Sequence, residues 1–424
     1  MANAFNKEER VAFDEVLAGF DDELTISRNV GVYRTEGQMM ARTNDTIWRP
    51  MPYIVPSYDG MDQTANFNDK TQLSVPSTIG FKKSVPLTLD AIELRDMLQE
   101  GRLRDAAKQR LSSDINIAVT NTACLGGTLV VKRTGAIVGF DDIASCGTLM
   151  REQGVASMGK TIGIHTREYQ PMSANLAARQ TVAGKTQTAY EQALIGNNVA
   201  GFRAFELEYS YRLTAAAGTT VTINGANQRY VPKATSTAST GEVSNVDNRY
   251  QNLTVSVSSG TIKVGDCFTI AGVNSVHQIT KGDTGQLKTF RVTAIVSGSG
   301  GSGVIQISPP IIAADSSPTQ PEVQYKNVTA TPANGAAITW LNTAAANVQP
   351  FWSNEAIEVL PGRYAVPESA GAAVMRGTTD QGFELVMSKQ YDVKTMKTFI
   401  RFDTMFGTVL KNPEMAGILL LQQT

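Results

Sequence analysis

The chain has 424 residues, with 38 basic and 39 acidic side chains and a formal net charge of −1. This length is enough for two or three domains whose cores need no metal or disulfide. The near balance of charge gives no strong attraction for a polyanion and argues against sequence-specific nucleic-acid binding. Three widely spaced cysteines, Cys124, Cys146 and Cys267, indicate neither a disulfide framework nor a zinc site, so we expect buried, reduced thiols.

Targeting signals are not evident in the sequence. No N-terminal segment combines a basic start with an apolar run, and the longest apolar stretches are shorter than a membrane span. We therefore expect a protein that is made and kept in the cytoplasm, with no membrane partner.

The first 24 residues are acidic and show helical periodicity. Phe13, Val16, Leu17 and Phe20 recur at the spacing of an amphipathic helix. Two interpretations stay open, namely a solvated terminal helix and a docking arm for a basic partner. The acidic side chains are Glu8, Glu9, Asp14, Glu15, Asp21, Asp22 and Glu23.

Residues 50–86 contain five prolines, which exclude a helix through this segment. The polar middle, 59–70, cannot bury enough surface to fold compactly alone. The sequence therefore predicts an extended surface loop.

A long helix is predicted over 88–123, with Thr88 as a candidate N-cap. Apolar residues lie four apart along one stripe, and the helix would be about 50 Å long. Gly101 is a potential weak point. A basic cluster in the middle is interpreted either as a solvated face or as a surface near DNA. The stripe is Leu103, Ala107, Leu111, Ile115 and Val119, and the cluster is Arg102, Arg104, Lys108 and Arg110.

The central region has the pattern of a mixed α/β segment, and the following region is β-rich. We expect a helix over 140–152, a buried strand over 161–164, and two segments, 169–178 and 188–194, that alternate with loops. Short strands separated by turns then predict a small antiparallel barrel. The predicted strands are 219–223, 253–257, 267–270, 290–296, 304–307 and 322–325, followed by 356–360, 383–387 and 398–402 outside the barrel.

The segment 154–161 satisfies the spacing of a phosphate-binding Walker A loop and is the strongest indication of a different function. That loop needs a strand before it and a helix after it, so that backbone amides and the helix N-terminus face the phosphate. Here the predicted order is reversed, and we expect a helix-to-strand turn. The alternative is a nucleotide-binding protein that uses Lys160 and Thr161.

Other catalytic patterns are weak. Residues 298–303 match a dinucleotide fingerprint, but a second strand-like run follows where a helix is needed, so a hairpin connection is expected. Only two histidines exist, His165 and His277, in different proposed domains, which argues against a histidine triad or a multi-histidine metal site. We expect no catalytic residues, no cofactor and no metal, and the protein is not predicted to be an enzyme.

Four segments carry a resemblance to a known family. They are Thr46-Ile47-Trp48 with Pro50; Val246 to Tyr250 leading into Leu253, Val255 and Val257; Gly265-Asp266 followed by 268–273; and 351–357 together with Asn412-Pro413-Glu414. In this order and spacing the chain resembles the major coat protein of short-tailed phages of the Salmonella type. The resemblance implies an α+β fold, the capsid fold of tailed phages and herpesviruses, with an inserted antiparallel β-barrel domain.

The resemblance also implies a domain plan and a set of partners. The plan is an N-terminal arm (1–30), a capsid core (31–216) with an extended loop (50–86) and a spine helix (88–123), an inserted barrel (217–343), and C-terminal strands that complete the core (344–424). The expected partners are further copies of the chain in pentamers and hexamers, a scaffolding protein, a portal protein, and enclosed double-stranded DNA contacted without sequence specificity. The expected location is the virion, after assembly in host cytoplasm. A third hypothesis, a secreted adhesive β-protein, fits the Ser/Thr/Gly-rich region but lacks a signal peptide.

Given this resemblance, particular charged residues become candidates for contacts. Asp14 and Glu15 are candidates for binding the scaffolding protein. The loop over 229–248 is expected to contact a neighbouring capsomer across a local two-fold axis, and its candidates are Arg229, Lys233, Glu242, Asp247 and Arg249. The spine-helix candidates for the inner surface are Arg102, Arg104, Lys108 and Arg110.

Overall fold

The computed structural model describes residues 7–33, 46–52, 54–55, 57–64, 67, 69–90, 97–155, 159–179, 199–207, 209–218, 220–315, 317–365 and 372–424. The chain divides into two compact units. The first comprises 1–47, 77–119 and 358–409, and the second comprises 48–76, 120–357 and 410–424.

The predicted N-terminal helix of the first unit is confirmed as α1 (Lys7–Glu23) and is followed by a short 3-10 turn, η1 (Ser27–Asn29). Phe13, Val16 and Phe20 are buried, as their helical spacing predicts. The remaining positions of the helix are mostly polar and turn to solvent. The apolar stripe therefore determines which face of α1 packs on the unit.

The long helix, α2 (Met97–Gly126), has 30 residues and is about 45 Å long. Four residues of the predicted stripe, Ala107, Leu111, Ile115 and Val119, are buried. The predicted start at Thr88 is wrong. Thr88 pairs with Phe399 in a sheet, because a continuous row of partners along β22 (Lys397–Leu410) holds 81–90 extended.

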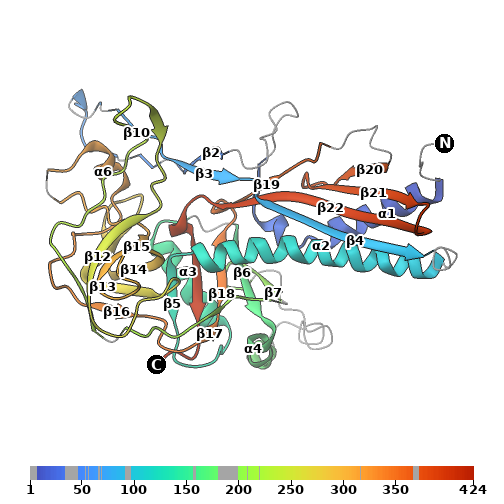
Figure 1. Cartoon of the computed structure of the whole chain (residues 1–424). Helices are drawn as coiled ribbons and strands as arrows, with labels where there is room; N and C mark the ends of the chain where they lie inside the picture. Colours follow the sequence, from blue (N-terminus) through green and yellow to red (C-terminus); the bar gives the residue numbers. More distant parts are fainter. Residues whose placement is uncertain are drawn as a thin grey trace. The chain divides into compact units, whose positions relative to one another are not determined.

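The first unit contains one six-stranded sheet in the order β1-β19-β22-β21-β20, with β4 also paired to β22. Figure 1 shows β4, β20, β21 and β22 running alongside one another. The strands predicted over 356–360, 383–387 and 398–402 are confirmed, and the last is much longer than predicted. The bounds are β1 (Gly31–Val32), β4 (Phe81–Asp90), β19 (Ile357–Pro361), β20 (Ala373–Thr378) and β21 (Glu384–Asp392).

The predicted extended loop is shorter than 50–86. Strands β2 (Thr46–Pro50) and β3 (Ser74–Thr78) pair with each other, and β4 already begins at Phe81. The described residues between β2 and β3 form no regular strand or α-helix. The excursion is therefore 51–73, and the β2–β3 pair brings its two ends together.

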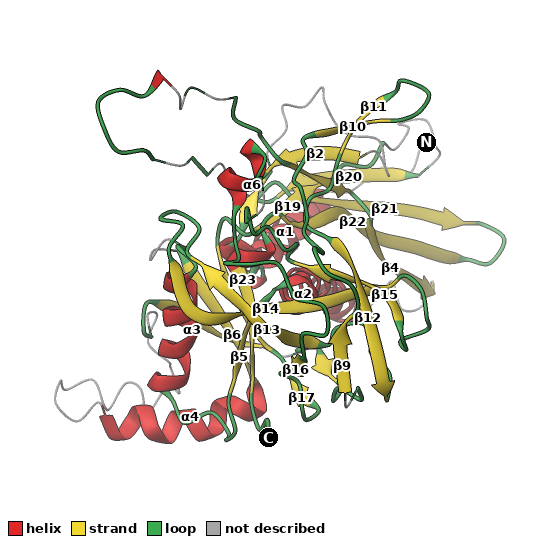
Figure 2. Ribbon diagram, turned by 90° about the vertical axis from the view of Figure 1, so that its left-hand side faces the viewer, coloured by secondary structure: helices red, strands yellow, loops and turns green. Residues whose placement is uncertain are grey.

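A five-stranded mixed sheet lies in the second unit, in the order β5-β23-β18-β6-β7. Helices α3 (Phe140–Glu152) and α4 (Thr166–Arg179) lie beside it (Figure 2). The predictions of a helix over 140–152 and of a buried strand over 161–164 are confirmed. Residues 169–178 lie in α4, and 188–194 fall outside the described residues. The strands are β5 (Leu129–Lys132), β6 (Lys160–His165), β7 (Phe202–Leu207), β18 (Gln349–Ser353) and β23 (Ala416–Leu420).

A second sheet of this unit is antiparallel, with the order β16-β13-β14-β15-β12-β9. Its two edges meet, because β9 bonds to the residues just before β16. The Ile223 amide donates to the Ala336 carbonyl at 2.9 Å, and the Gly335 amide donates to the Ile223 carbonyl at 2.8 Å. The sheet thus curls around an apolar core that includes Phe268, Phe290 and Trp340. The strands are β9 (Thr220–Ile223), β12 (Gln251–Ser259), β13 (Cys267–Val276), β14 (Asp283–Ile295), β15 (Gly303–Ser308) and β16 (Ile338–Trp340).

Short elements complete the second unit. Strands β8 (Arg212–Leu213) and β17 (Ala346–Asn347) pair with each other, as do β10 (Thr235–Thr237) and β11 (Val243–Asn245). The link between β14 and β15 is a glycine-rich hairpin connection, as predicted, and the matching dinucleotide pattern has no helix after it.

The strand predicted over 322–325 is wrong, because these residues form the end of helix α6 (Gln320–Tyr325). Thr319 and Glu322 make a reciprocal capping box, and Pro321 stands in the first turn, where its missing amide is tolerated. These local signals outweigh the apolar alternation that suggested a strand.

Candidate functional site

The hairpin of β10 and β11 is the most exposed part of the predicted contact loop. All three residues of each strand are exposed, and Thr235 pairs with Asn245 at its open end. Lys233 and Glu242 are exposed, and neither makes an ion pair with any residue that the structure describes. A two-stranded hairpin without a buried face is marginal in water. The hairpin therefore depends on its base or on a partner.

The base of the hairpin is firmly bonded to the rest of the second unit. The Asn248 side chain accepts the Lys233 amide at 3.0 Å and donates to the Lys233 carbonyl at 2.8 Å, which closes the loop. The Arg249 guanidinium pairs with Asp247 at 2.7 Å and donates to the Leu410 carbonyl at 2.9 Å. Asp247 and Arg249 thus bond within the chain and orient the hairpin.

Arg229, the remaining candidate of this loop, also has partners within the chain. Its guanidinium lies 3.5 Å from the Glu322 carboxylate and 3.8 Å from that of Asp315. Glu322 is fully buried. Arg229 therefore neutralises a buried carboxylate in the first turn of α6. Of the five loop candidates, only Lys233 and Glu242 present unpaired charges among the described residues.

The acidic side chains of α1 divide into two groups. Arg28 lies 3.0 Å from Asp21 and 3.8 Å from Asp22, while the other pairs join Glu23 to Lys108 at 3.5 Å and Glu9 to Lys389. Asp14 and Glu15 are exposed. Of the acidic residues of α1 whose side chains the structure describes, these two make no ion pair with a described residue. Periodicity predicted the acidic face, but only the structure separates these two from the rest.

The basic cluster of α2 is largely balanced by carboxylates of its own unit. Lys108 pairs with Glu23 and lies 3.6 Å from Asp105, and Arg110 lies 3.1 Å from Asp114. Arg102 is exposed, and Arg104 is partly buried. The cluster is therefore a weaker positive surface than its sequence suggests.

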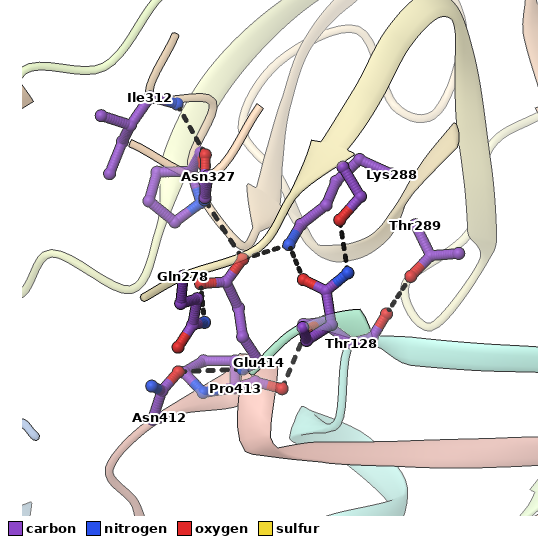
Figure 3. Close-up of polar contacts among 12 residues, drawn as sticks. Thr128, Gln278, Lys288, Thr289, Ile312, Asn327, Asn412, Pro413 and Glu414 are labelled. Atoms are coloured by element: carbon purple, nitrogen blue, oxygen red, sulfur yellow. Dashed lines mark hydrogen bonds and ion pairs between the residues drawn. The ribbon is translucent and has the colours of Figure 1, made fainter. Parts of the chain in front are cut away.

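A buried polar network surrounds the Asn-Pro-Glu turn, which forms η4 (Pro413–Met415) (Figure 3). The Asn412 side chain accepts the Glu414 amide at 3.0 Å, and this bond aims the Glu414 carboxylate into the unit. There it accepts hydrogen bonds from Gln278 at 2.7 Å and Asn327 at 3.2 Å. It also pairs with the ammonium of Lys288, whose side chain is 1% exposed.

The same network reaches Thr128, beside the central sheet (Figure 3), and the turn after α3. Lys288 donates to the Gln153 side chain at 2.8 Å. Thr128, beside β5, donates to the Pro413 carbonyl at 2.8 Å, and its own carbonyl accepts the Thr289 hydroxyl at 2.7 Å. The network thus ties the curled sheet to the central sheet. The sequence analysis singles out Asn-Pro-Glu as part of the resemblance but gives no role to Lys288, which no local pattern distinguishes.

Lys281, next to this network, has a perturbed ionisation. Burial lowers its pKa to about 8, and the nearby Glu414 carboxylate only partly offsets this. The ammonium donates to the Lys326 carbonyl at 3.2 Å. In the unfolded chain a lysine has a pKa of about 10.4. Between about pH 8 and 10, Lys281 is therefore protonated in the unfolded state and mostly neutral in the folded state.

We therefore expect stability to rise with pH over that interval in a Lys281-dependent way. Solvent screening of this partly exposed group limits the effect to about 1–2 kcal/mol. Urea unfolding at pH 7.5 and pH 10 measures it. Lys281→Met should be more stable than the parent at pH 7.5 and should lose the advantage at pH 10. An equal difference at both values would show that Lys281 is not the titrating group.

The segment that resembles a Walker A loop follows a helix and precedes a strand, which is the predicted order of elements. Helix α3 ends at Glu152, and Lys160 begins strand β6. The Lys160 side chain is buried with its ammonium 5.7 Å from the Phe202 ring centre, and burial lowers its pKa. Residues 156–158 lie outside the described residues. This order of elements does not provide the helix N-terminus on which a phosphate loop depends, so the nucleotide-binding alternative is not supported.

The remaining reactive residues have structural surroundings. All three cysteines are buried and free, and burial raises the thiol pKa of Cys124 to about 12 and of Cys267 to about 11. In the described parts of the chain, no group of three or more His, Cys, Asp or Glu side chains is arranged to hold a metal ion. Of the helices described, none is long and apolar enough to cross a membrane.

Comparison with known proteins gives a match over almost the whole chain. The family model described as P22 coat protein, gene protein 5, matches residues 1–421. The protein is therefore a viral coat protein, a structural component of the virion. The chain belongs to the P22 coat protein family and is a major capsid protein that assembles with itself into a shell.

Solved structures provide further likenesses. That of Mycobacterium phage Che8 is 10% identical over 94% of this chain and 92% of that chain, with a TM-score of 0.46. The capsid structure of cyanophage P-SCSP1u is 10% identical over 94% and 89%, with a TM-score of 0.45. The CUS-3 coat protein I-domain is 45% identical over 29% of this chain and 96% of that chain, with a TM-score of 0.23. The family assignment follows from the full-length match alone.

Proposed function

We propose that shell assembly uses three exposed segments of this chain: the β10–β11 hairpin, the tip of the extended loop, and the acidic face of α1. The strongest support for this proposal comes from the hairpin. It presents two opposite charges without an ion pair among the described residues, Lys233 just before β10 and Glu242 just before β11. Neither strand has a buried side chain, while the base of the hairpin is fixed within the chain. A segment built this way gains buried surface only from a partner.

The hairpin contact is proposed to join neighbouring capsomers across a local two-fold axis. In such an isologous contact, Lys233 of one copy faces Glu242 of the other twice. Each exposed pair contributes only about 0.2–1 kcal/mol. The contact matters because it repeats at every such axis, and many weak contacts act together in a closed shell.

Reversal of Lys233 to Glu should yield open or aberrant particles, because it places like charges opposite each other at every contact. The second change Glu242→Lys should restore closed shells by exchanging the two signs. Electron microscopy of assembled particles is the measurement, with circular dichroism of the subunit to show that folding is intact. Lys394→Glu, at another exposed lysine, is the matched control. Closed shells from Lys233→Glu alone would refute a governing role for this pair.

The extended loop is proposed to lie over a neighbouring subunit of the same capsomer. Met61 and Phe67 are almost entirely exposed, at 105% and 88%. Large apolar side chains held in water at the tip of an anchored loop are typical of segments that become buried on association. Shell contacts made by this loop complement those of the hairpin.

The acidic face of α1 is proposed to bind a basic segment of a scaffolding protein during assembly in host cytoplasm. Asp14 and Glu15 support this role, because their charges are exposed and lack an ion pair within the described part of α1. A portal protein and enclosed DNA are the other proposed partners. DNA contact would be unspecific and limited, since Lys108 and Arg110 are already paired.

Replacing Asp14 by Lys should weaken co-sedimentation with the scaffolding protein by several-fold, while the coat subunit stays folded. Attraction between exposed charges is screened, so binding of the parent protein should also fall as salt rises beyond about 0.15 M. Asp22→Lys is an informative comparison, because Asp22 already faces Arg28. If neither salt nor Asp14→Lys alters binding, an electrostatic binding site for the scaffolding protein on this helix is excluded.

Residues 217–343 are proposed to be a separately inserted barrel domain. The curled antiparallel sheet and its apolar core support this proposal, since a domain of this size can bury its own interior. The test is a purified 217–343 fragment, which should give dispersed amide resonances.

A further inference from the structure

The extended loop leaves and re-enters the second unit through two cross-bonded arms. The Met51 amide donates to the Leu73 carbonyl at 2.9 Å. The Gln72 side chain donates to the Met51 carbonyl at 2.9 Å. These bonds hold the arms together but do not determine the direction in which the loop points.

Helix α6 makes hydrogen bonds to both arms. The Gln324 side chain, 3% exposed, accepts the Thr71 amide at 3.1 Å and donates to the Ile54 carbonyl at 2.9 Å. The Tyr325 hydroxyl donates to the Thr71 carbonyl at 2.8 Å. One buried amide therefore bonds to the outgoing and the returning arm simultaneously, and a neighbouring phenol reinforces the second contact.

The base of the β10–β11 hairpin contacts the returning arm of the extended loop and the same helix. Ser74, on the returning arm, forms a parallel β-bridge with Asp247 at the hairpin base. Leu73 and Tyr325 belong to one apolar cluster, against which Tyr230 packs. The Tyr230 hydroxyl donates to Asn248, the residue that closes the hairpin, at 3.0 Å.

Helix α6 is itself well fixed despite its short length. Its capping box uses one oxygen of Glu322, which accepts the Thr319 amide at 2.7 Å. The other oxygen of this buried carboxylate lies 3.5 Å from Arg229, which precedes the hairpin. The helix is therefore bonded to the hairpin side of the root as well as to the loop side.

We propose that α6 is a shared anchor that fixes the extended loop and the β10–β11 hairpin relative to each other within the free subunit. Gln324 is the positioning residue of this anchor, because its amide is the group that contacts both arms of the loop. The anchor is a property of the monomer. Its consequence for assembly rests on the proposed function of the two segments.

Hydrogen exchange of the monomeric full chain tests the anchor directly. Gln324→Leu removes the bonds to both arms, and the Thr71 amide should exchange at least about tenfold faster, as expected for the loss of one or two hydrogen bonds. Amides at the hairpin base, including Val246, should also exchange faster. Gln320→Leu, at an exposed position of the same helix, is the matched control and should leave both regions unchanged.

Tyr325→Phe is a milder variant that controls for misfolding, because it removes the hydroxyl that bonds to the Thr71 carbonyl and keeps the ring in the apolar cluster. It should accelerate exchange at the loop root by a smaller factor than Gln324→Leu. Faster exchange confined to the loop, with the hairpin base unaffected in both variants, would overturn the shared anchor. Unchanged exchange in the loop would overturn it as well.

Assembly assays separate this inference from the proposed function. Met61→Ser changes only the exposed loop tip, so it should impair shell formation while exchange at Thr71 stays at the parent rate. If Gln324→Leu accelerates exchange at Thr71 and at the hairpin base but shells still form normally, the shared anchor is supported and the proposed assembly role of the loop is wrong. If Met61→Ser accelerates exchange at the root, the loop is not held independently by α6 and the anchor fails.

Discussion

Replacing Lys288 by Met should destabilise the subunit by about 3–5 kcal/mol, the typical cost of leaving a buried carboxylate without its cation. Lys288 is 1% exposed and pairs with Glu414, whose other hydrogen-bonding side chains are the neutral amides of Gln278 and Asn327. The nearby Lys281 ammonium donates to the Lys326 carbonyl and makes no ion pair with Glu414 among the described residues. The neutral amides cannot compensate the carboxylate charge. The loss should appear as a lower midpoint in urea unfolding followed by circular dichroism.

A second change tests whether the buried charge is the cause. Glu414→Gln combined with Lys288→Met removes both charges and keeps one oxygen that can accept a hydrogen bond. More than half of the lost stability should return, because pairs of buried charges are often replaceable when both members go. Lys394→Met, at an exposed lysine, should change stability by less than about 0.5 kcal/mol. A double variant as unstable as the single one would instead implicate packing of the lysine side chain.

The second large effect is expected at Gly417, in the middle of the central sheet. Strand β23 is hydrogen-bonded on one side to β18 and on the other to β5, with Gly417 opposite Phe351 and Leu129. A Cβ at this position would stand 2.4 Å from the Leu129 carbonyl oxygen and 2.4 Å from the Phe351 ring. The backbone oxygen cannot move away without breaking the sheet. Gly417→Ala should therefore cost at least about 1–3 kcal/mol.

The control is Gly101→Ala on α2. A Cβ at Gly101 would meet no atom within 4 Å, and the residue is exposed in a helix. This substitution should stabilise the subunit by about 0.5–1 kcal/mol, because alanine loses less conformational entropy than glycine in a helix. Thermal unfolding should thus shift in opposite directions for the two variants. A neutral Gly417→Ala would mean that β23 can shift against its neighbours.

The network around Glu414 gives the Asn-Pro-Glu turn a physical role. Asn412 caps the turn, Pro413 starts it, and Glu414 accepts hydrogen bonds from two side chains outside the central sheet. A second connection is the proposed anchor at α6, which is bonded to the extended loop and to Arg229 before the hairpin. Both connections lie within the second unit, so the extended loop and the β10–β11 hairpin, which we propose to be contact segments, are attached to a preorganised body.

Several features of the fold are determined by the sequence alone. The spacing of Phe13, Val16 and Phe20 predicts α1, and the stripe ending at Val119 predicts most of α2, because helical periodicity is a local property. Alternation and turn residues likewise predict β9, β12, β13, β14 and β15 of the curled sheet, but not its edge strand β16. Around 154–161 the local pattern already places the helix first and the strand second, which is the wrong order for a phosphate loop.

Other features are decided only by tertiary contacts. Thr88 lies in a strand because β22 offers a hydrogen-bonding edge that the local pattern does not reveal. Asp14 differs from Asp21 because Arg28, and not periodicity, determines which carboxylate is paired. Lys288 and Glu414 are separated by more than a hundred residues, and their burial as a pair depends on how the sheets are packed. The local sequence pattern therefore determines most of the elements and the family, whereas long-range packing decides the remaining elements and which charges are paired within the subunit.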